Sequence, residues 1–319
     1  MQQNELQVLF DDFLREQQYT AGARPDTLEG YRAALSLLFK LAPDADLKSV
    51  QERSFWIGLF ETLQTRTRTL NNGKQHKGVK NSTLLTYRSK WGKFMRWLVD
   101  TRQIKENPLP TISKPHVEYV DRRYLTETEI HKLLQFCQYD YEWATEFLRC
   151  RNYTILKLLI LTGIRRNELL GFTLESVNME QRTLTVEGKT SKSKLTRTIP
   201  LQRELMVELQ RYLRAREDHP IAYTTNALFV SSKRNRPLGK HGLKHLADLI
   251  KQKSGVNFFV HRCRHTYAAN LYAQGVSLSH VQQLMGHVDP RMTLKYGRQV
   301  TTEALRDSVE KLGNGKYVG

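Results

Sequence analysis

The sequence predicts a mainly α-helical protein of the α+β class, organised as two domains. Apolar residues recur at helical spacing through most of the 319 residues, and only one short region alternates as strands do. Prolines at positions 108, 110 and 115 interrupt the pattern, and the length suits two domains. We expect a helical bundle at 1–110, a linker at 111–124, and a mostly helical domain with a small antiparallel sheet at 125–319.

The first domain is expected to contain four helices. The first three are predicted at Leu6–Gln17, from Pro25 to just before Pro43, and at Lys48–Leu63. Thr65–Val79 is polar and basic and contains glycine, which predicts a loop. Asn81 and Ser82 are typical N-cap residues, and they precede a long helix whose apolar stripe runs from Leu84 to Val99.

Charge is distributed unevenly along this first domain. Residues 1–61 hold six Lys and Arg against ten Asp and Glu, whereas Arg66–Arg102 holds ten against one. A charged helix often presents only a solvated face, but such local asymmetry favours a surface that faces phosphates. Together with a formal net charge of +18, it predicts nucleic acid as the partner. The expected contacts are Lys80, Arg88, Lys90, Lys93 and Arg96.

The second domain is expected to begin at a capping box formed by Thr126 and Glu129. The apolar run Ile155–Leu161 predicts a buried helix end, and Gly163 is expected to stop it in a left-handed or tight conformation. Strands are predicted at Thr183–Val186 and Thr196–Ile199. Further helices are predicted at Arg203–Arg214, His241–Lys253, His261–Gln274, Ser277–Met285, Arg291–Tyr296 and Thr302–Leu312.

Two arginines, two histidines and one tyrosine in this domain make a set that suits phosphodiester chemistry. They are Arg165, His261, Arg264, His287 and Tyr296. Arginines clamp phosphate bidentately, histidines transfer protons near neutral pH, and a tyrosine can become a covalent phosphoryl acceptor. His261 and Arg264 are three residues apart, which places both on one side of a helix.

These motifs resemble those of the tyrosine recombinases, the phage-integrase family, whose catalytic domain is similar in outline to that of type IB topoisomerases. The matching segments are Gly163-Ile164-Arg165 with Glu168-Leu169, His261-x-x-Arg264-His265, Leu284-x-Gly286-His287, and Tyr296. Their order and spacing make the resemblance specific, and it covers roughly residues 125–312. The first 110 residues match only in general character, and the resemblance implies that they form a core-binding domain.

The resemblance also implies a role for each matched residue. Tyr296 would be the nucleophile and His261 the general base, while Arg165, Arg264 and His287 would stabilise charge on the phosphate. A lysine in the hairpin turn would protonate the departing 5′ oxygen. Lys189 fits the family's usual place, and Lys192 is the alternative because the turn is longer than the commonest form. The product would be a 3′-phosphotyrosyl linkage, which keeps the energy of the broken bond and needs no metal or other cofactor.

Other interpretations exist for some of these residues. Glu168 lies one helical turn after Arg165 and would orient it or a nearby histidine, although a plain helix ion pair is an alternative. His261, Cys263 and His265 suggest a metal site, but alternate residues on a helix diverge by about 200°, which argues against zinc. Cys263 is more simply an apolar core contact, and His265 a packing or supporting group.

The expected partners are double-stranded DNA and further copies of the chain, because recombination requires four protomers on two sites. Residues 301–312 are long enough to dock onto a neighbouring protomer, or to pack on their own domain. The competing functions are DNA relaxation like that of a type IB topoisomerase and a non-catalytic DNA-binding regulator. Three scattered cysteines, no apolar run of membrane-spanning length and no signal-peptide pattern predict a cytoplasmic, nucleoid-associated protein.

Overall fold

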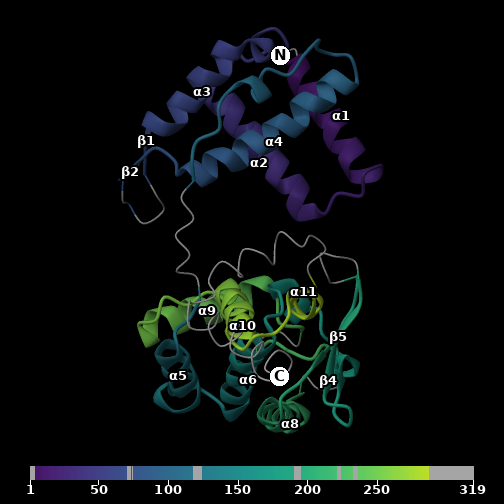
Figure 1. Ribbon diagram of the computed structural model, residues 1–319, viewed down its shortest axis with the longest axis vertical. Helices are drawn as coiled ribbons and strands as arrows, with labels where there is room; N and C mark the ends of the chain where they lie inside the picture. The colour runs from purple at the N-terminus through teal and green to yellow at the C-terminus, as the bar shows by residue number, and fades with distance from the viewer. Residues whose placement is uncertain are drawn as a thin grey trace, which may run out of the picture. The chain divides into compact units, whose positions relative to one another are not determined.

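The computed structural model describes residues 4–69, 73, 75–117, 124–189, 195–220, 224–232 and 236–286. The chain divides into two compact units, Met1–Val120 and Asp121–Gly319 (Figure 1). Both units are mostly helical with small antiparallel sheets, which confirms the predicted fold class. Within the described ranges, no helix is both long and apolar enough to cross a membrane.

The first unit is a helical bundle. Its α-helices, within the described residues, are α1 (Glu5–Tyr19), α2 (Pro25–Leu41), α3 (Arg53–Thr65) and α4 (Asn81–Asp100). Short 3-10 turns lie at Ser49–Gln51 and Leu109–Thr111. The core joins the apolar stripes of all four helices, and buried indoles complete it through hydrogen bonds. Trp91 Nε1 donates to Ala34 O at 2.9 Å, and Trp56 Nε1 donates to Val50 O at 2.8 Å.

Two local features of this unit differ from the sequence prediction. The expected loop at 65–79 contains an antiparallel ribbon of β1 (Thr67–Thr69) and β2 (Gln75–Lys77). The ribbon is polar on both faces, so it lacks the alternation that marks a half-buried strand. The predicted N-cap of α4 is also wrong, because Asn81 is the first helical residue and its Nδ2 donates to His116 O at 2.9 Å.

The segment after α4 stays on the first unit beyond the predicted start of the linker. Ile112 packs against the core of the bundle, and the hydrogen bond from Asn81 holds the backbone at His116. The prolines therefore mark a chain that follows the bundle surface, and its described part reaches residue 117.

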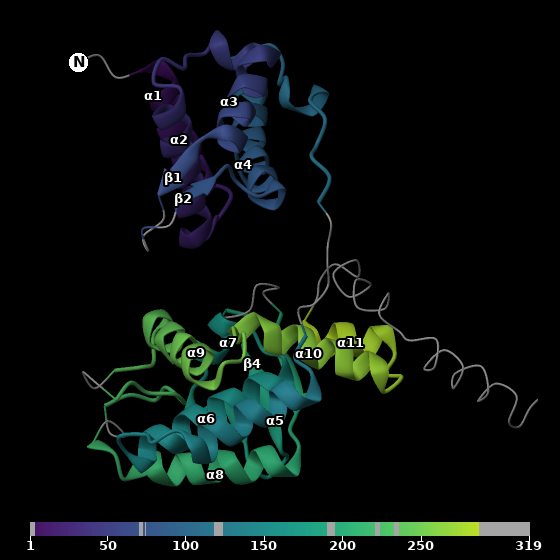
Figure 2. The ribbon, with the colours of Figure 1, turned by 90° about the vertical axis from the view of Figure 1, so that its left-hand side faces the viewer.

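The second unit is built around one buried helix. Its main helices are α5 (Glu127–Gln135), α6 (Glu146–Thr162), α8 (Arg203–Glu217), α9 (Lys240–Ser254), α10 (Val260–Ala273) and α11 (Leu278–Met285). The predicted capping box of Thr126 and Glu129 opens α5. α6 lies between α8 and α10 (Figure 2) and buries residues on every side, as an enclosed helix must.

A three-stranded antiparallel sheet flanks these helices. Its strands are β3 (Val177–Asn178), β4 (Thr183–Val186) and β5 (Arg197–Pro200), in the order β3-β4-β5. The register pairs Leu184 with Ile199 and Val186 with Arg197. The prediction of a hairpin here is confirmed, with its second strand starting one residue later than expected. β5 also lies beside α11, which brings the hairpin next to the start of the Leu284-x-Gly286 motif.

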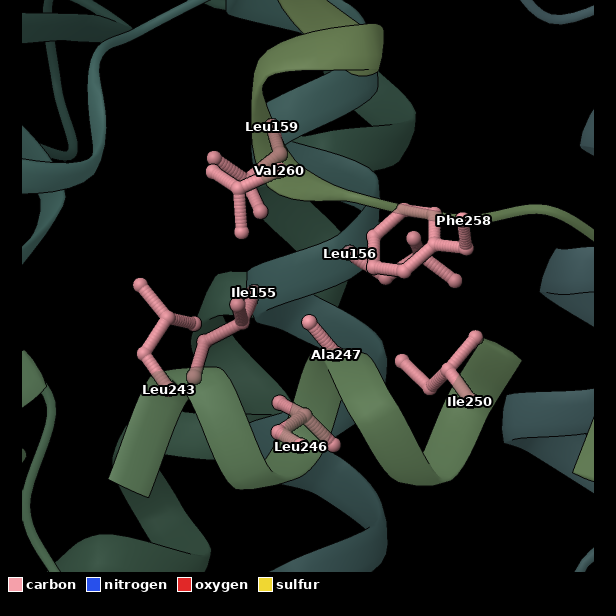
Figure 3. A pocket seen from close by; sticks show the side chains of 9 residues that line it. All are labelled: Ile155, Leu156, Leu159, Leu243, Leu246, Ala247, Ile250, Phe258 and Val260. Carbon is pink, nitrogen blue, oxygen red and sulfur yellow. The ribbon is translucent and has the colours of Figure 1, made fainter. Parts of the chain in front are cut away.

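Apolar packing fixes the start of α10 against α6. Figure 3 shows the side chains at this contact, which come from α6, α9, the first residue of α10 and the segment before it. They are Ile155, Leu156, Leu159, Leu243, Leu246, Ala247, Ile250, Phe258 and Val260. The space between them admits no water, so it is a packed core and not a ligand site. Val260 directly precedes His261, and Leu159 lies four residues before Gly163, so this core positions both predicted site segments.

Candidate active site

The turn after α6 presents Arg165. Gly163 ends the helix in the left-handed conformation, with φ of 58°, as the sequence predicts. A Cβ at this glycine would lie 2.6 Å from Cδ1 of Tyr267 on α10, so the turn also needs the missing side chain for close packing. Arg165 follows as the N-cap residue of α7 (Arg166–Leu170), and its side chain is 17% exposed.

Glu168 is a fully buried carboxylate between two arginines. It accepts hydrogen bonds from the backbone N and from Nη1 of Arg165, at 2.9 and 2.8 Å. Its two oxygens also accept from Nη1 and Nη2 of Arg197, at 3.1 and 2.8 Å. Burial alone raises the pKa of Glu168, but the hydrogen bonds and charge of Arg197, followed by the hydrogen bonds of Arg165, outweigh burial and hold the pKa at about 2.

Arg264 joins the ends of two helices. The side chain comes from α10, is 2% exposed, and donates from Nη1 to Gly163 O at 2.7 Å. Its Nη2 donates to Met285 O at the end of α11. Arg165 reaches the same end through a 3.1 Å hydrogen bond from Nη2 to Gly286 O. Two arginines from motifs 99 residues apart therefore meet at residues 285–286, directly before His287.

His261 lies in the first turn of α10 and is exposed. Its ring contacts that of His265, one turn later, with centroids 4.8 Å apart and the planes nearly perpendicular. Arg264, between them in sequence, is buried, so α10 carries a buried arginine between an exposed histidine, His261, and a half-buried one, His265. Cys263 is fully buried, and burial raises the pKa of its thiol to about 12, which makes it a core contact and a poor metal ligand.

The start of α10 is tied to the beginning of the second unit. Arg262 donates from Nη2 to Glu129 Oε2 at 2.7 Å and to Tyr124 O at 3.0 Å. Thr266 accepts a 2.8 Å hydrogen bond from the backbone N of Leu125. These contacts hold the helix that supplies His261 and Arg264 against the segment where the chain enters this unit.

The remaining predicted residues of the second unit are only partly described. Lys189 is exposed and follows β4 at the start of the hairpin turn, where Gly188 N donates to Thr196 Oγ1 at 3.0 Å. Lys192 lies outside the described residues, so the choice between the two lysines stays a prediction. His287 and Tyr296, the expected helix that contains Tyr296, and the expected helix at 302–312 also lie outside them.

The predicted DNA contacts on α4 divide into two kinds. Lys80, Lys93 and Arg96 are exposed, and Lys90 is half-buried. Arg88 differs, because it is 7% exposed and its Nη2 donates to Leu109 O and Ile112 O. It is therefore a structural residue that holds the segment after α4, and not part of the exposed basic surface.

Arg197 is the site residue that the sequence prediction missed. Its side chain is 8% exposed, and it binds both oxygens of Glu168. A signal was present, because alternation in β5 places Arg197 on the same face as the buried Ile199. A cation on the inner face of a strand requires a buried counter-charge.

Comparison with known proteins is consistent with this geometry. The sequence profile described as the phage integrase family matches residues 123–303. The tyrosine recombinase XerA of Pyrococcus horikoshii is 34% identical over 190 residues, which are 59% of this chain and 60% of that protein. The tyrosine recombinase XerD of Shewanella oneidensis is 24% identical over 306 residues, 95% of this chain and 94% of that protein.

A solved structure shows the shared fold. The Tn1549 transposon integrase, in complex with transposon right end DNA, has a TM-score of 0.70 and 19% identity, over 97% of this chain and 99% of that one. The match of the family profile to more than half of the sequence is decisive, and it coincides with the segments that carry Arg165, His261 and Arg264. The chain belongs to the phage integrase family, the tyrosine recombinases.

Proposed function

We propose that this chain is a site-specific DNA recombinase that cleaves and rejoins double-stranded DNA through a 3′-phosphotyrosyl intermediate on Tyr296. The observation that carries the proposal is the convergence of Arg165 and Arg264 on the carbonyls of residues 285 and 286. The two arginines concentrate positive charge beside Gly286, the residue directly before His287. The relatives named above are tyrosine recombinases, and the Tn1549 integrase was solved with DNA.

The proposed reaction exchanges one ester bond for another. The phenolic oxygen of Tyr296 attacks phosphorus, a bond to that oxygen forms, and the bond from phosphorus to the 5′ oxygen breaks. A phenol has an ordinary pKa near 10, so His261 takes its proton as general base, and Lys189 gives a proton to the departing 5′ oxygen. The exposure of His261 and Lys189 leaves both side chains accessible to a substrate.

The arginines stabilise the negative charge that grows on the phosphate in the transition state. A guanidinium carries its N–H donors in a planar fork that matches the oxygens of a phosphate. His287 is proposed as a further donor. Glu168 holds Arg165 at the N-cap of α7 and is proposed as a supporting residue, while the exposed Lys80, Lys93 and Arg96, with Lys90, are proposed to bind the DNA backbone.

Strand exchange follows if the 5′-hydroxyl of a second duplex attacks the phosphotyrosyl bond. Four protomers on two DNA sites are part of the proposal, because each of the four strands needs one nucleophile. We also place the protein on cytoplasmic DNA. The three cysteines are free thiols, which agrees with a reducing compartment.

The test is to trap the intermediate and identify its DNA. The chain is incubated with fragments of genomic DNA from the organism that encodes it, and protein-linked fragments are sequenced. Suicide duplexes of the recovered sequence carry a nick next to the cleavage site, so the short strand with the 5′-hydroxyl diffuses away after cleavage. The wild-type protein should then accumulate as a covalent adduct with the DNA. Tyr296→Phe should bind the same duplex and form none.

Three outcomes separate the alternatives. An adduct of normal yield from Tyr296→Phe contradicts the assignment of the nucleophile. DNA binding without any adduct from wild type indicates a non-catalytic regulator. An adduct together with relaxation, but no exchange between two duplexes, indicates an activity like that of a type IB topoisomerase.

A further inference from the structure

Arg197, the first residue of β5, is buried beside the proposed active site and uses all three of its nitrogens there. Nη1 and Nη2 donate to the two oxygens of Glu168, and Nε donates to Leu284 O at 3.0 Å. Its side chain is only 8% exposed. An arginine held in this way is rigid, because the planar fork fits a carboxylate bidentately while the third nitrogen fixes a separate element.

We propose that Arg197 is a positioning residue, which keeps the charge of Arg165 available for the phosphate and holds the end of α11 in place. The inference rests on the proposed function, because it assigns Arg197 a part in the same cleavage step. Arg197 acts through Glu168 and through the backbone of α11, and has no assigned contact with DNA.

The first step of the argument is charge balance. Glu168 is fully buried, and its carboxylate lies 2.8 Å from Nη1 of Arg165. With these two residues alone the pair would be neutral, and Glu168 would cancel the charge that Arg165 offers to a phosphate. Arg197 lies equally close, at 2.8 Å, and gives the three side chains a net charge of +1. Charges interact strongly in such a poorly solvated place, so the third charge has a large effect.

The second step is the position of α11. Gly286 ends this helix with φ of 60°, and a Cβ there would lie 2.8 Å from Nη1 of Arg197. The helix end therefore rests directly on the guanidinium. Since Arg197 also binds Leu284 O, it restrains the last turn of α11, which precedes His287 in the sequence.

The third step is the hairpin. Arg197 pairs with Val186 in the antiparallel register of β4 and β5, three residues before Lys189. Arg197 thus connects the hairpin that leads to Lys189 with Glu168, which binds Arg165. It also connects the hairpin with the last turn of α11. Arg165 also binds Glu168 and the end of α11, but with one guanidinium nitrogen each. Arg197 differs because it binds both carboxylate oxygens of Glu168 and uses its third nitrogen for Leu284 O.

The experiment measures single-turnover adduct formation on the nicked suicide duplex at saturating concentration. Arg197→Met should slow it by about 10²–10³-fold, the usual effect of losing an electrostatic contribution to an active site. DNA affinity should change little, because phosphate contacts along the whole duplex set it. Arg197→Lys keeps a cation without the fork, and should lose about tenfold.

The discriminating variant removes the charge that Arg197 balances. Glu168→Gln added to Arg197→Met should recover at least about tenfold of the lost rate, since the coupling between contacting residues appears in such a cycle. A role of Arg197 in folding alone predicts that the double variant is slower than Arg197→Met, because a second buried contact is then lost.

Arg216→Met is the matched control for stability. Arg216 is 2% exposed and donates from Nη2 to Thr225 O and Ala227 O, in the same unit but away from the proposed site. It should lower Tm and leave the rate unchanged at a permissive temperature. Equal rate losses in Arg197→Met and Arg216→Met, or no recovery in the double variant, overturn the inference.

Three further outcomes separate failure of the inference from failure of the proposed function. If Arg197→Met does not fold, Arg197→Lys decides, and a wild-type rate in that variant contradicts the inference. If wild type itself forms no adduct, the proposed function fails and the inference falls with it. A normal wild-type adduct with an unaffected Arg197→Met variant overturns the inference alone.

Discussion

Arg264 donates from Nη1 to the carbonyl oxygen of Gly163 at 2.7 Å, although 101 residues separate them in the sequence. The bond anchors the left-handed turn that ends α6 and presents Arg165. The bond couples the motif that contains Arg165 with the motif that contains Arg264, so the position of one arginine depends on the other. A change in this turn should therefore affect stability and catalysis together.

Gly163→Ala should destabilise the second unit and abolish most adduct formation. Alanine at φ of 58° is strained by about 1–2 kcal/mol, and its Cβ would also meet Cδ1 of Tyr267 at 2.6 Å. Gly275→Ala is the control, because this glycine has φ of 73° and open space around it, so it carries the strain without the clash. Tm should fall clearly more in Gly163→Ala than in Gly275→Ala. Equal decreases in Tm would show that close packing against Tyr267 contributes nothing.

Glu168→Gln should cost about 3–5 kcal/mol near neutral pH, because it leaves the guanidinium of Arg197, 8% exposed, and that of Arg165, 17% exposed, without their fully buried counter-charge. Glu146→Gln is the control, since Glu146 forms an exposed pair with Arg149 and should cost less than about 1 kcal/mol. Pulse proteolysis in urea reports the free energy of unfolding of each unit.

The pH dependence of the Glu168→Gln effect has a definite sign. The pKa of Glu168 lies at about 2, below the ordinary value of 4.5, so its stabilisation is complete above about 4.5 and is lost as the pH falls towards 2. The difference in stability between wild type and Glu168→Gln should shrink across that window. A difference that stays constant from pH 6 to pH 3 would mean that the carboxylate charge contributes nothing.

Lys189→Ala should slow cleavage of ordinary DNA by about 10²–10⁴-fold, the usual effect of losing general acid–base catalysis. A suicide duplex with a 5′-thiolate leaving group needs no proton and should restore the rate. The same comparison on Lys192→Ala is the control. Rescue in Lys192→Ala and none in Lys189→Ala would move the proposed acid three residues along the hairpin.

Helix periodicity predicted most of the architecture, because apolar stripes and helix stops depend on local sequence. The same periodicity contained information that the prediction of DNA contacts overlooked. Arg88 lies four residues after Leu84 and three before Trp91, both buried, so it is on the apolar face of α4. The charge of a residue does not place it in solvent when its position on the helix faces the core.

The spacing of the sequence motifs could not identify Arg197 as a site residue. Its importance comes from contacts with Glu168 and Leu284, which are distant in sequence and meet only when β5 packs against α11. Alternation in the strand indicated an inward-facing cation, but it gave no information about the partner. The ribbon of β1 and β2 escaped prediction because two polar faces leave no periodic pattern.

The exposed basic face of α4 should set the salt dependence of DNA binding. Each phosphate contact releases condensed counterions and contributes about −0.9 to the slope of log K against log salt for B-DNA. Replacing Lys90, Lys93 and Arg96 by alanine should therefore weaken binding and flatten the slope by up to about three contacts' worth. Titrations of a fluorescent duplex over a range of salt concentrations measure both quantities.

Arg88→Met is the matched control, because it removes a positive charge from the same helix at a buried position. Its guanidinium is bound to Leu109 O and Ile112 O, so the substitution should lower the stability of the first unit and leave the slope unchanged. A slope that flattens equally in Arg88→Met would show that net charge alone, and not exposed contacts, governs binding. If the triple variant keeps both affinity and slope, this face of α4 is only solvated, and the DNA must be bound by other residues.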